Sequence, residues 1–293
     1  VKPEGFVVRK VANGVIQLQE GVSSQEKALS LYVPEDAVGG SVFASITAVG
    51  DIMGPTLQGL ESLLTIPSGC GEQNMMTLAP NVYVGKYLHS VGRLSADLQQ
   101  RIVRNIVIGY GRQLTYQRSD GSFSAFGEQD SAGSTWLTAF TIRVFAEVHA
   151  SGLAAVDPQV MIDACEWLLT LLDEDESFFQ SSGMVIHQEM MGGIGSSSGH
   201  GRPIGFLGPP ESPSSQPQMS ETDRKVALTS FVVIALTRVR AVLQPDLSPA
   251  GLDNALTRAR GYLTSKTPEL SAHAVYAKVL SAYARVIVQP SDS

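Results

Sequence analysis

A helical spacing of apolar residues runs through most of this chain and restricts its fold more than any other feature. From about residue 55 onward, apolar side chains recur at intervals that place them on one face of an α-helix. Several of these stretches open on residues that favour helix starts: Ser95, and Asp157 and Ser248, which each precede a proline. The pattern predicts helices over residues 55–65, 72–89, 95–117, 133–150, 157–172, 222–243, 248–264 and 270–287.

The first 50 residues follow a different pattern. Apolar and polar residues alternate over 16–19, 28–33 and 41–49, and turn-forming Pro and Gly residues separate these stretches. Such alternation is typical of half-buried β-strands. Three strands cannot bury both of their faces, so we expect residues 1–50 to form part of a β-domain that other sequence completes.

Two loop segments resemble each other. Residues 120–127 (DGSFSAFG) and 176–183 (ESFFQSSG) each follow an expected helix and end on a glycine. A turn that recurs between helices favours stacked α-hairpins, although chance likeness between Ser- and Gly-rich loops explains one pair equally well. Residues 192–220 are rich in Gly, Ser and Pro, which predicts a long flexible loop.

The segment PSGCGEQNM, residues 67–75, carries the most chemical information. The sulfur of Cys70 can displace ammonia from the side-chain amide of Gln73, which leaves an internal thioester in a ring of about 15 members. Gly69 and Gly71 have no Cβ and can adopt the backbone angles that so small a ring requires. An ordinary reactive cysteine at a helix N-terminus is the alternative that the residues alone leave open.

A disulfide is a further alternative, because Cys165 is the second of two cysteines in the chain. A single possible pair gives no disulfide framework. The glycines around Cys70 therefore favour a chemical role for that cysteine over a structural cross-link.

Residues 69–75 (GCGEQNM) resemble the thioester signature of the α2-macroglobulin and complement superfamily. Segments 79–84 (APNVYV), 120–123 (DGSF) and 134–140 (STWLTAF) also resemble the thioester domain of that family, and the likeness covers nearly the whole chain. It implies a mainly α fold, with an α/α toroid of helical hairpins over residues 51–293. The toroid is expected to be incomplete at its C-terminal end, and a partial CUB-like β-sandwich segment over residues 1–50 is expected to precede it.

The same resemblance assigns the site. It implies that Cys70 and Gln73 form the thioester and that Gly69, Gly71 and Glu72 support the ring. No cofactor is expected beyond this internal cross-link.

A third candidate for chemistry is His187, within residues 185–190 (VIHQEM). This segment resembles the place where many family members carry the histidine that governs thioester reactivity. A neutral imidazole is both a nucleophile and a base. The resemblance implies that His187 takes the acyl group, releases the Cys70 thiolate and favours hydroxyl acceptors, whereas members with asparagine there favour amines.

Other classes of function find little support in the sequence. The net charge is −7 and no basic cluster is present, which argues against nucleic-acid binding. No apolar run approaches the roughly 18–20 residues that span a bilayer. His187 and His200 lack the spacing of a zinc motif, so no metal is expected. The acidic run 173–176 is expected to be a solvated turn.

The resemblance implies the thioester domain of a secreted, extracellular macroglobulin-type endopeptidase inhibitor. After proteolytic activation it would acylate the attacking protease or a nearby surface once, which is not enzymatic turnover. Its partners would be target proteases, hydroxyls and amines of microbial surfaces, and other domains of the parent protein. The alternative is a complement-like opsonin that forms ester bonds to microbial surfaces in innate immunity. A toroidal glycosidase would require paired carboxylates, and no such pair is evident.

Overall fold

The computed structural model describes residues 8–16, 24, 26–46, 59–187 and 219–288. The chain divides into two compact units, Val1–Pro55 and Thr56–Ser293. Within the described part of the first unit, the backbone forms turns at 35–36 and 39–40 and no strand. Apolar side chains such as Phe43 and Ile46 are almost fully exposed there. The CUB-like segment expected over residues 1–50 is not shown by these residues and stays a prediction.

The second unit consists mainly of helices. In chain order they are α2 (Gly71–Ser90), α3 (Ala96–Leu114), α4 (Thr135–Ser151), α5 (Pro158–Thr170), α6 (Glu221–Val242), α7 (Leu252–Lys266) and α8 (Val275–Ile287). They agree with seven of the eight predicted helices within a few residues at each end. Of the remaining prediction, 55–65, residues 59–61 are helical and 62–65 are not, while 55–58 lie outside the described residues, as does most of the loop predicted over 192–220. None of the described helices is long and apolar enough to cross a membrane.

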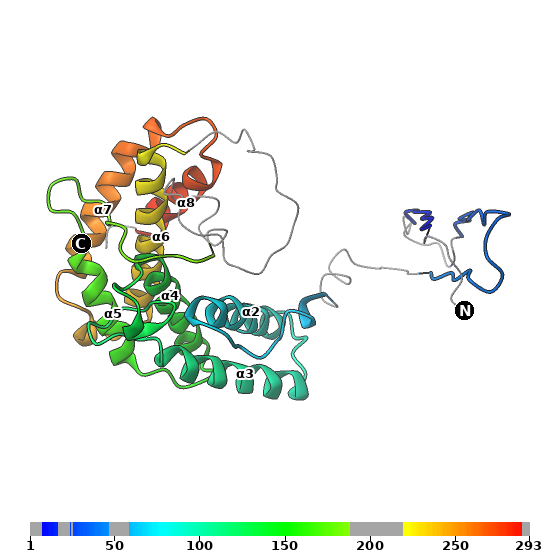
Figure 1. Ribbon diagram of the computed structural model, residues 1–293, viewed down its shortest axis with the longest axis horizontal. Coiled ribbons are helices and arrows are strands. Elements are labelled where there is room, and N and C mark those ends of the chain that lie inside the picture. Colours follow the sequence, from blue (N-terminus) through cyan, green and yellow to red (C-terminus); the bar gives the residue numbers. More distant parts are fainter. Residues whose placement is uncertain (1–7, 17–23, 25, 47–58, 188–218, 289–293) are drawn as a thin grey trace. The chain divides into compact units, whose positions relative to one another are not determined.

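The helices form an inner and an outer layer. The inner helix α4 packs against both α2 and α6, and α6 packs in turn against α8. The outer helices α3, α5 and α7 cover α2, α4 and α6 respectively (Figure 1). Helices α4 and α6 are buried on nearly all sides, because neighbours surround them, and they are accordingly apolar around most of their circumference. The predicted mainly α fold is confirmed, and the two layers are consistent with an α/α toroid.

Helix starts follow the expected capping residues in two of three cases. The side chains of Ser95 and Asp157 accept hydrogen bonds from backbone N–H groups in the first turns of α3 and α5. The prediction for Ser248 is wrong. Helix α7 begins after Gly251, which has φ +82°, because Pro249 starts a separate turn in which its carbonyl accepts the N–H of Leu252.

The two loops that resemble each other in sequence are each closed by one antiparallel β-bridge. After α3, Gln117 forms a single β-bridge with Phe123, and after α5, Leu172 forms one with Phe179. Pairing of Gln117 with Phe123 also explains why α3 ends at Leu114, three residues before its predicted end. The internal repeat is therefore structural, because a similar bridged turn follows the outer helices α3 and α5.

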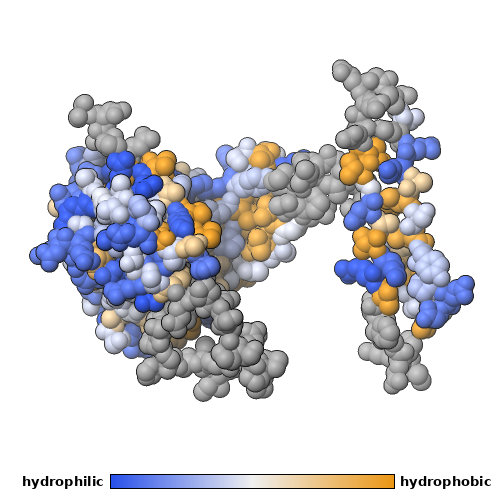
Figure 2. Space-filling view, turned by 90° about the horizontal axis from the view of Figure 1, so that it is seen from above, coloured by the Kyte–Doolittle hydropathy of each residue, from blue (hydrophilic) through white to orange (hydrophobic). Residues whose placement is uncertain are grey.

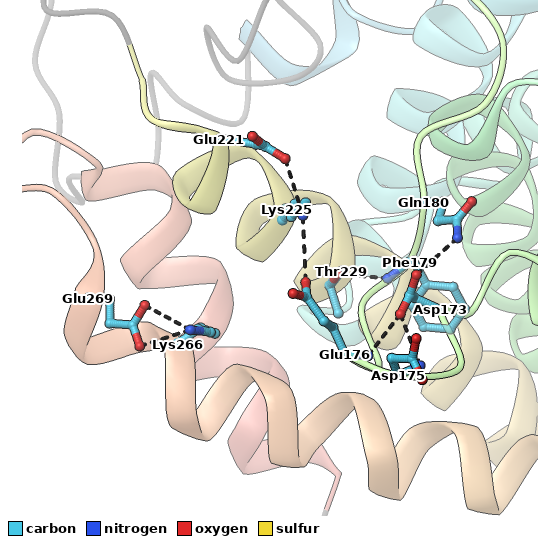
Figure 3. A network of polar contacts seen from close by, with 10 residues as sticks. All are labelled: Asp173, Asp175, Glu176, Phe179, Gln180, Glu221, Lys225, Thr229, Lys266 and Glu269. Carbon is cyan, nitrogen blue, oxygen red and sulfur yellow. Dashed lines mark hydrogen bonds and ion pairs between the residues drawn. The ribbon is translucent and has the colours of Figure 1, made fainter.

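Each bridged turn is fastened to the next inner helix by a threonine. The buried backbone N–H of Phe123 donates to Thr138 Oγ1 of α4 at 2.9 Å. That of Phe179 donates to Thr229 Oγ1 of α6 at 3.0 Å (Figure 3). A buried N–H group without a partner is costly, so these hydroxyls fix the turns in place.

The acidic run 173–176 forms a turn, as the sequence predicted. The Asp173 carboxylate accepts the backbone N–H groups of Asp175 and Glu176 at 3.1 and 2.8 Å (Figure 3). The hydrogen bond from Glu176 is the main cause that lowers the pKa of Asp173 below its usual value. The charge of this run therefore organises its own turn, and Lys225 of α6 pairs with Glu176 beside it.

Apolar residues remain at the surface of both units (Figure 2). On α8 they form a stripe of Val275, Val279, Tyr283 and Val286, each more than half exposed, on the helix face away from its buried residues Ala277, Ser281 and Ala284. The described neighbours of α8 therefore leave this apolar face uncovered.

The threonine links give a direct test of the fold. Replacing Thr229→Val keeps the shape of the side chain but leaves the Phe179 N–H unpaired, so it should lower the free energy of unfolding by about 1–3 kcal/mol in urea titrations. Thr264→Val, on the exposed face of α7, is the control and should change it by less than about 0.5 kcal/mol. Equal losses in both variants would contradict the assigned role.

Candidate functional site

Helix α2 begins in the middle of the predicted thioester segment. Cys70 is its N-cap residue, with an extended backbone, and Gln73 is the third helical residue. The backbone N–H of Cys70 donates to Gln73 Oε1 at 3.3 Å. The reciprocal contacts of a capping box are both formed, with cysteine where serine or threonine usually stands. The start of the helix thus folds the Gln73 side chain back over Cys70, which is the approach that ring closure requires.

The two flanking glycines are needed for different reasons. Gly69 has φ +86°, and a Cβ there would lie 2.2 Å from Gln73 Oε1. Gly71 lies in the first turn of the helix and has no such angle, so the predicted need for unusual backbone geometry is wrong at this position. A glycine is needed at position 71 because a Cβ would lie 2.7 Å from the Ser124 carbonyl oxygen. Its N–H also donates to the Ala125 carbonyl at 2.9 Å, so turn 120–127 lies against the site.

The Gly69 carbonyl oxygen is held from α3. It accepts hydrogen bonds from Arg112 Nε at 2.8 Å, from Arg112 Nη2 at 2.6 Å and from Tyr116 Oη at 2.7 Å. The sequence analysis missed both residues. Arg112 lies in the last turn of α3 and Tyr116 in the turn that follows it, and nothing in the sequence indicates that they share a target more than 40 residues away.

The carboxylate of Glu72 joins the thioester segment to the His187 segment. Glu72 is fully buried in the first turn of α2. Its Oε1 accepts the Ile186 N–H at 2.9 Å, and its Oε2 accepts the His187 N–H at 3.0 Å and faces His187 Nδ1 at 2.8 Å. A buried carboxylate requires such partners, and the positive end of the helix dipole adds to them. The structure therefore brings His187, Cys70 and Gln73 to one helix end.

The contact with Glu72 sets the hydrogen position on the neutral imidazole. An ionised carboxylate only accepts hydrogen bonds, so Nδ1 of His187 carries the hydrogen and Nε2 keeps a free lone pair. The side chain of His187 is 29% exposed, and Cys70 is also partly exposed. Both groups are thus open to a molecule that arrives from solution.

Close backbone packing determines where the His187 segment runs. Gly183 has φ +69°, and a Cβ there would lie 2.5 Å from the Gly133 carbonyl oxygen. The first N–H of α4, on Thr135, donates to the Ser182 carbonyl at 3.1 Å. The chain therefore crosses the start of α4 before it reaches α2. Sequence reasoning missed this role of Gly133 and Gly183, although Gly183 ends the repeated loop motif.

Buried amides fix α2 below the site. Asn74 Nδ2 donates to the Gly109 carbonyl and to Gln113 Oε1, both at 2.9 Å. Gln113 Nε2 in turn donates to Thr141 Oγ1 of α4 at 3.2 Å. These bonds tie α2, α3 and α4 together at the residue directly after Gln73, so the candidate site stands on a rigid support.

The structure also shows where the residues of a possible disulfide and of a possible metal site lie. Cys70 and Cys165 are both free, so they do not form the disulfide that was left open. Burial raises the pKa of the Cys165 thiol far above its usual value, which keeps it protonated and unreactive. Within the described ranges, no group of three His, Cys, Asp or Glu side chains could hold a metal ion. His200 lies outside the described residues.

Comparisons with known proteins identify the family of the chain. The family model described as A-macroglobulin TED domain matches residues 46–293. Ovostatin of Gallus gallus is 41% identical over 194 residues, which cover 66% of this chain and 13% of that protein. The chain therefore spans a small part of the length of this relative.

The geometry at Gly69 makes a prediction with a matched control. Gly69→Ala should lower the free energy of unfolding by about 1–3 kcal/mol more than Gly92→Ala, because both glycines have a positive φ but only Gly69 lacks space for a Cβ. Urea titration of both variants measures the difference. Equal losses would show that the clash with Gln73 is relieved without cost.

Proposed function

This chain belongs to the family of A-macroglobulin TED domains, and from that membership we propose that it is the thioester domain of a secreted endopeptidase inhibitor of the macroglobulin type. The capping contact between Cys70 and Gln73 is the observation that supports this proposal most directly. It places the amide of Gln73 beside the N-cap cysteine before any covalent bond exists. The likeness to Ovostatin supports the macroglobulin type within the family.

The proposed ring closes by one acyl transfer. Cys70 Sγ attacks Gln73 Cδ, the S–C bond forms, the C–N bond to Nε2 breaks, and ammonia leaves with the thiol proton. Gln73 Oε1 remains as the acyl oxygen of the thioester. The capping box lowers the entropic cost of this step, because the helix already holds both side chains at one end.

The ring opens when a nucleophile takes the acyl group. In the proposed mechanism, His187 Nε2 attacks Gln73 Cδ and the Cys70 thiolate leaves. A hydroxyl then displaces the imidazole and forms an ester, while the thiolate accepts the hydroxyl proton. Glu72 supports this role because it holds Nδ1–H and leaves Nε2 free. The negative charge of Glu72 also stabilises the imidazole ring when His187 becomes positively charged.

The proposed reaction happens once in each molecule. The released Cys70 thiol cannot regain its acyl group, since Gln73 stays bound to the target. The domain is therefore a single-use acylating agent and not an enzyme, and it needs no cofactor beyond the internal cross-link. Its proposed partners are attacking proteases, hydroxyls and amines of nearby surfaces, and the other domains of the parent protein in the extracellular space.

A complement-like opsonin is the second candidate, because His187 favours esters with surface hydroxyls. The two functions differ in what the activated protein retains. The full-length gene product should be treated with trypsin in the presence of yeast cell walls and then separated by denaturing electrophoresis. Protease covalently bound to the protein supports the inhibitor, and attachment to the cell walls alone supports the opsonin.

The thioester itself predicts a mass deficit. The untreated full-length product should weigh about 17 Da less than its sequence, the mass of one ammonia, and methylamine should add about 31 Da and release one titratable thiol. Cys70→Ser should show neither change. A wild-type product of full sequence mass with a free Cys70 thiol would refute the proposed function.

The choice of acceptor should depend on His187. His187→Asn should lower the ratio of glycerol to methylamine incorporation by about 10-fold or more, because general base catalysis is lost. Glu72→Gln should lower this ratio in the same direction, since it weakens the hold on Nδ1–H. The exposed His149→Asn serves as the control. An unchanged ratio in His187→Asn would remove its assigned role and leave the thioester in place.

A further inference from the structure

We propose that the Gly69–Cys70 peptide stabilises the oxyanion at Gln73, and that Arg112 and Tyr116 are positioning residues that orient and polarise this peptide. The inference rests on the proposed thioester and names the groups that tune its carbonyl. In this scheme the Cys70 N–H touches the reacting oxygen. Arg112 and Tyr116 act only through the Gly69 carbonyl.

The contacts form one continuous path. Three donors from Arg112 and Tyr116 meet the Gly69 oxygen at 2.6–2.8 Å. The other side of the same peptide unit, the Cys70 N–H, donates to Gln73 Oε1. A trans peptide points its C=O and N–H in opposite directions, so donors on one side and an acceptor on the other fix its orientation. The positive φ of Gly69 turns the peptide into this position.

The path has a defined electrostatic effect. Hydrogen bonds to a peptide oxygen draw electron density from its nitrogen and make the N–H a stronger donor. The guanidinium adds positive charge, and Arg112 also lies 6.0 Å from the centre of the Tyr116 ring, with Nη2 at 3.3 Å from Oη. The two side chains therefore support each other as well as the Gly69 oxygen.

Gln73 Oε1 is the atom that gains charge in both directions of the reaction. When Cys70 Sγ attacks Cδ during closure, or a nucleophile attacks Cδ during opening, the C=O electron pair moves onto this oxygen. The electron pair re-forms the C=O double bond when the C–N bond breaks during closure or the S–C bond breaks during opening. A fixed N–H at this oxygen is the arrangement of an oxyanion hole, and the N-terminus of α2 adds positive potential. The 3.3 Å distance belongs to the uncharged amide and should shorten as charge develops.

The test removes one hydroxyl from the path. Tyr116→Phe in the full-length gene product should slow thiol release by methylamine about 3- to 10-fold, because the donor remains but is less polarised. Tyr110→Phe is the control: Tyr110 lies on α3, six residues before Tyr116, and its hydroxyl accepts the Asp157 N–H away from the site. Arg112→Lys, which keeps the charge but loses the two-pronged contact, should also slow the reaction.

The sign and selectivity of the effect separate positioning from mere packing. Loss of polarisation should slow methylamine and glycerol alike, whereas a loosened site would expose the thioester and speed both. A Tyr116→Phe rate equal to or faster than that of Tyr110→Phe would overturn the proposal. Fewer closed rings in a folded Tyr116→Phe protein would support it, because closure passes through the same oxyanion.

A second measurement covers a variant that fails to fold. The infrared stretch of the wild-type thioester carbonyl, taken as the difference before and after methylamine, should lie at lower wavenumber than that of a simple alkyl thioester in an apolar solvent. Equal wavenumbers would overturn the proposal. Absence of the mass deficit in the wild type would instead refute the thioester itself, so the two failures are distinguishable.

Discussion

The return of the Gln73 side chain to the N–H of Cys70 is the contact on which the site depends. Helices commonly begin with such a reciprocal pair, because it satisfies N–H groups that have no partner in the helix. Here the capping residue carries a sulfur nucleophile and its partner carries an acyl group. In the proposed thioester, this ordinary device for starting a helix would be the precursor of a covalent ring. Because Gly69 has no Cβ, it leaves the space that this contact requires.

The site lies at a contact between a helix start and a loop that occurs twice in the fold. The first N–H of α2, on Gly71, donates to the carbonyl of Ala125 in the bridged turn that follows α3. The first N–H of α4, on Thr135, donates to Ser182 after the turn that follows α5. Each of these inner helices thus starts against the turn of the next hairpin. The candidate thioester segment lies at the first of these contacts, and the second directs the chain towards His187.

Much of this architecture could be predicted from local sequence. Apolar periodicity located seven helices, and the Cys70–Gln73 spacing picked out the two residues that meet at the start of α2, because both patterns lie within a few turns of chain. Arg112 and Tyr116 could not be found in this way, because they donate to the Gly69 carbonyl, 43 and 47 residues earlier in the chain. That acceptor is a backbone atom, which has no sequence signature. Ser248 misled for a related reason: the proline that follows it can start a helix or an isolated turn with equal ease.

The way Glu72 holds its partner has a consequence for how this domain can diversify. Two of its three hydrogen bonds are to backbone N–H groups, of Ile186 and His187, and neither depends on the identity of the side chain at 187. A substitution at residue 187 would change the side chain while the backbone of this segment stays bound to Glu72. Under the proposed mechanism, acceptor selectivity is thus separable from scaffold integrity, and one substitution at residue 187 would change the acceptor preference without releasing the segment from Glu72.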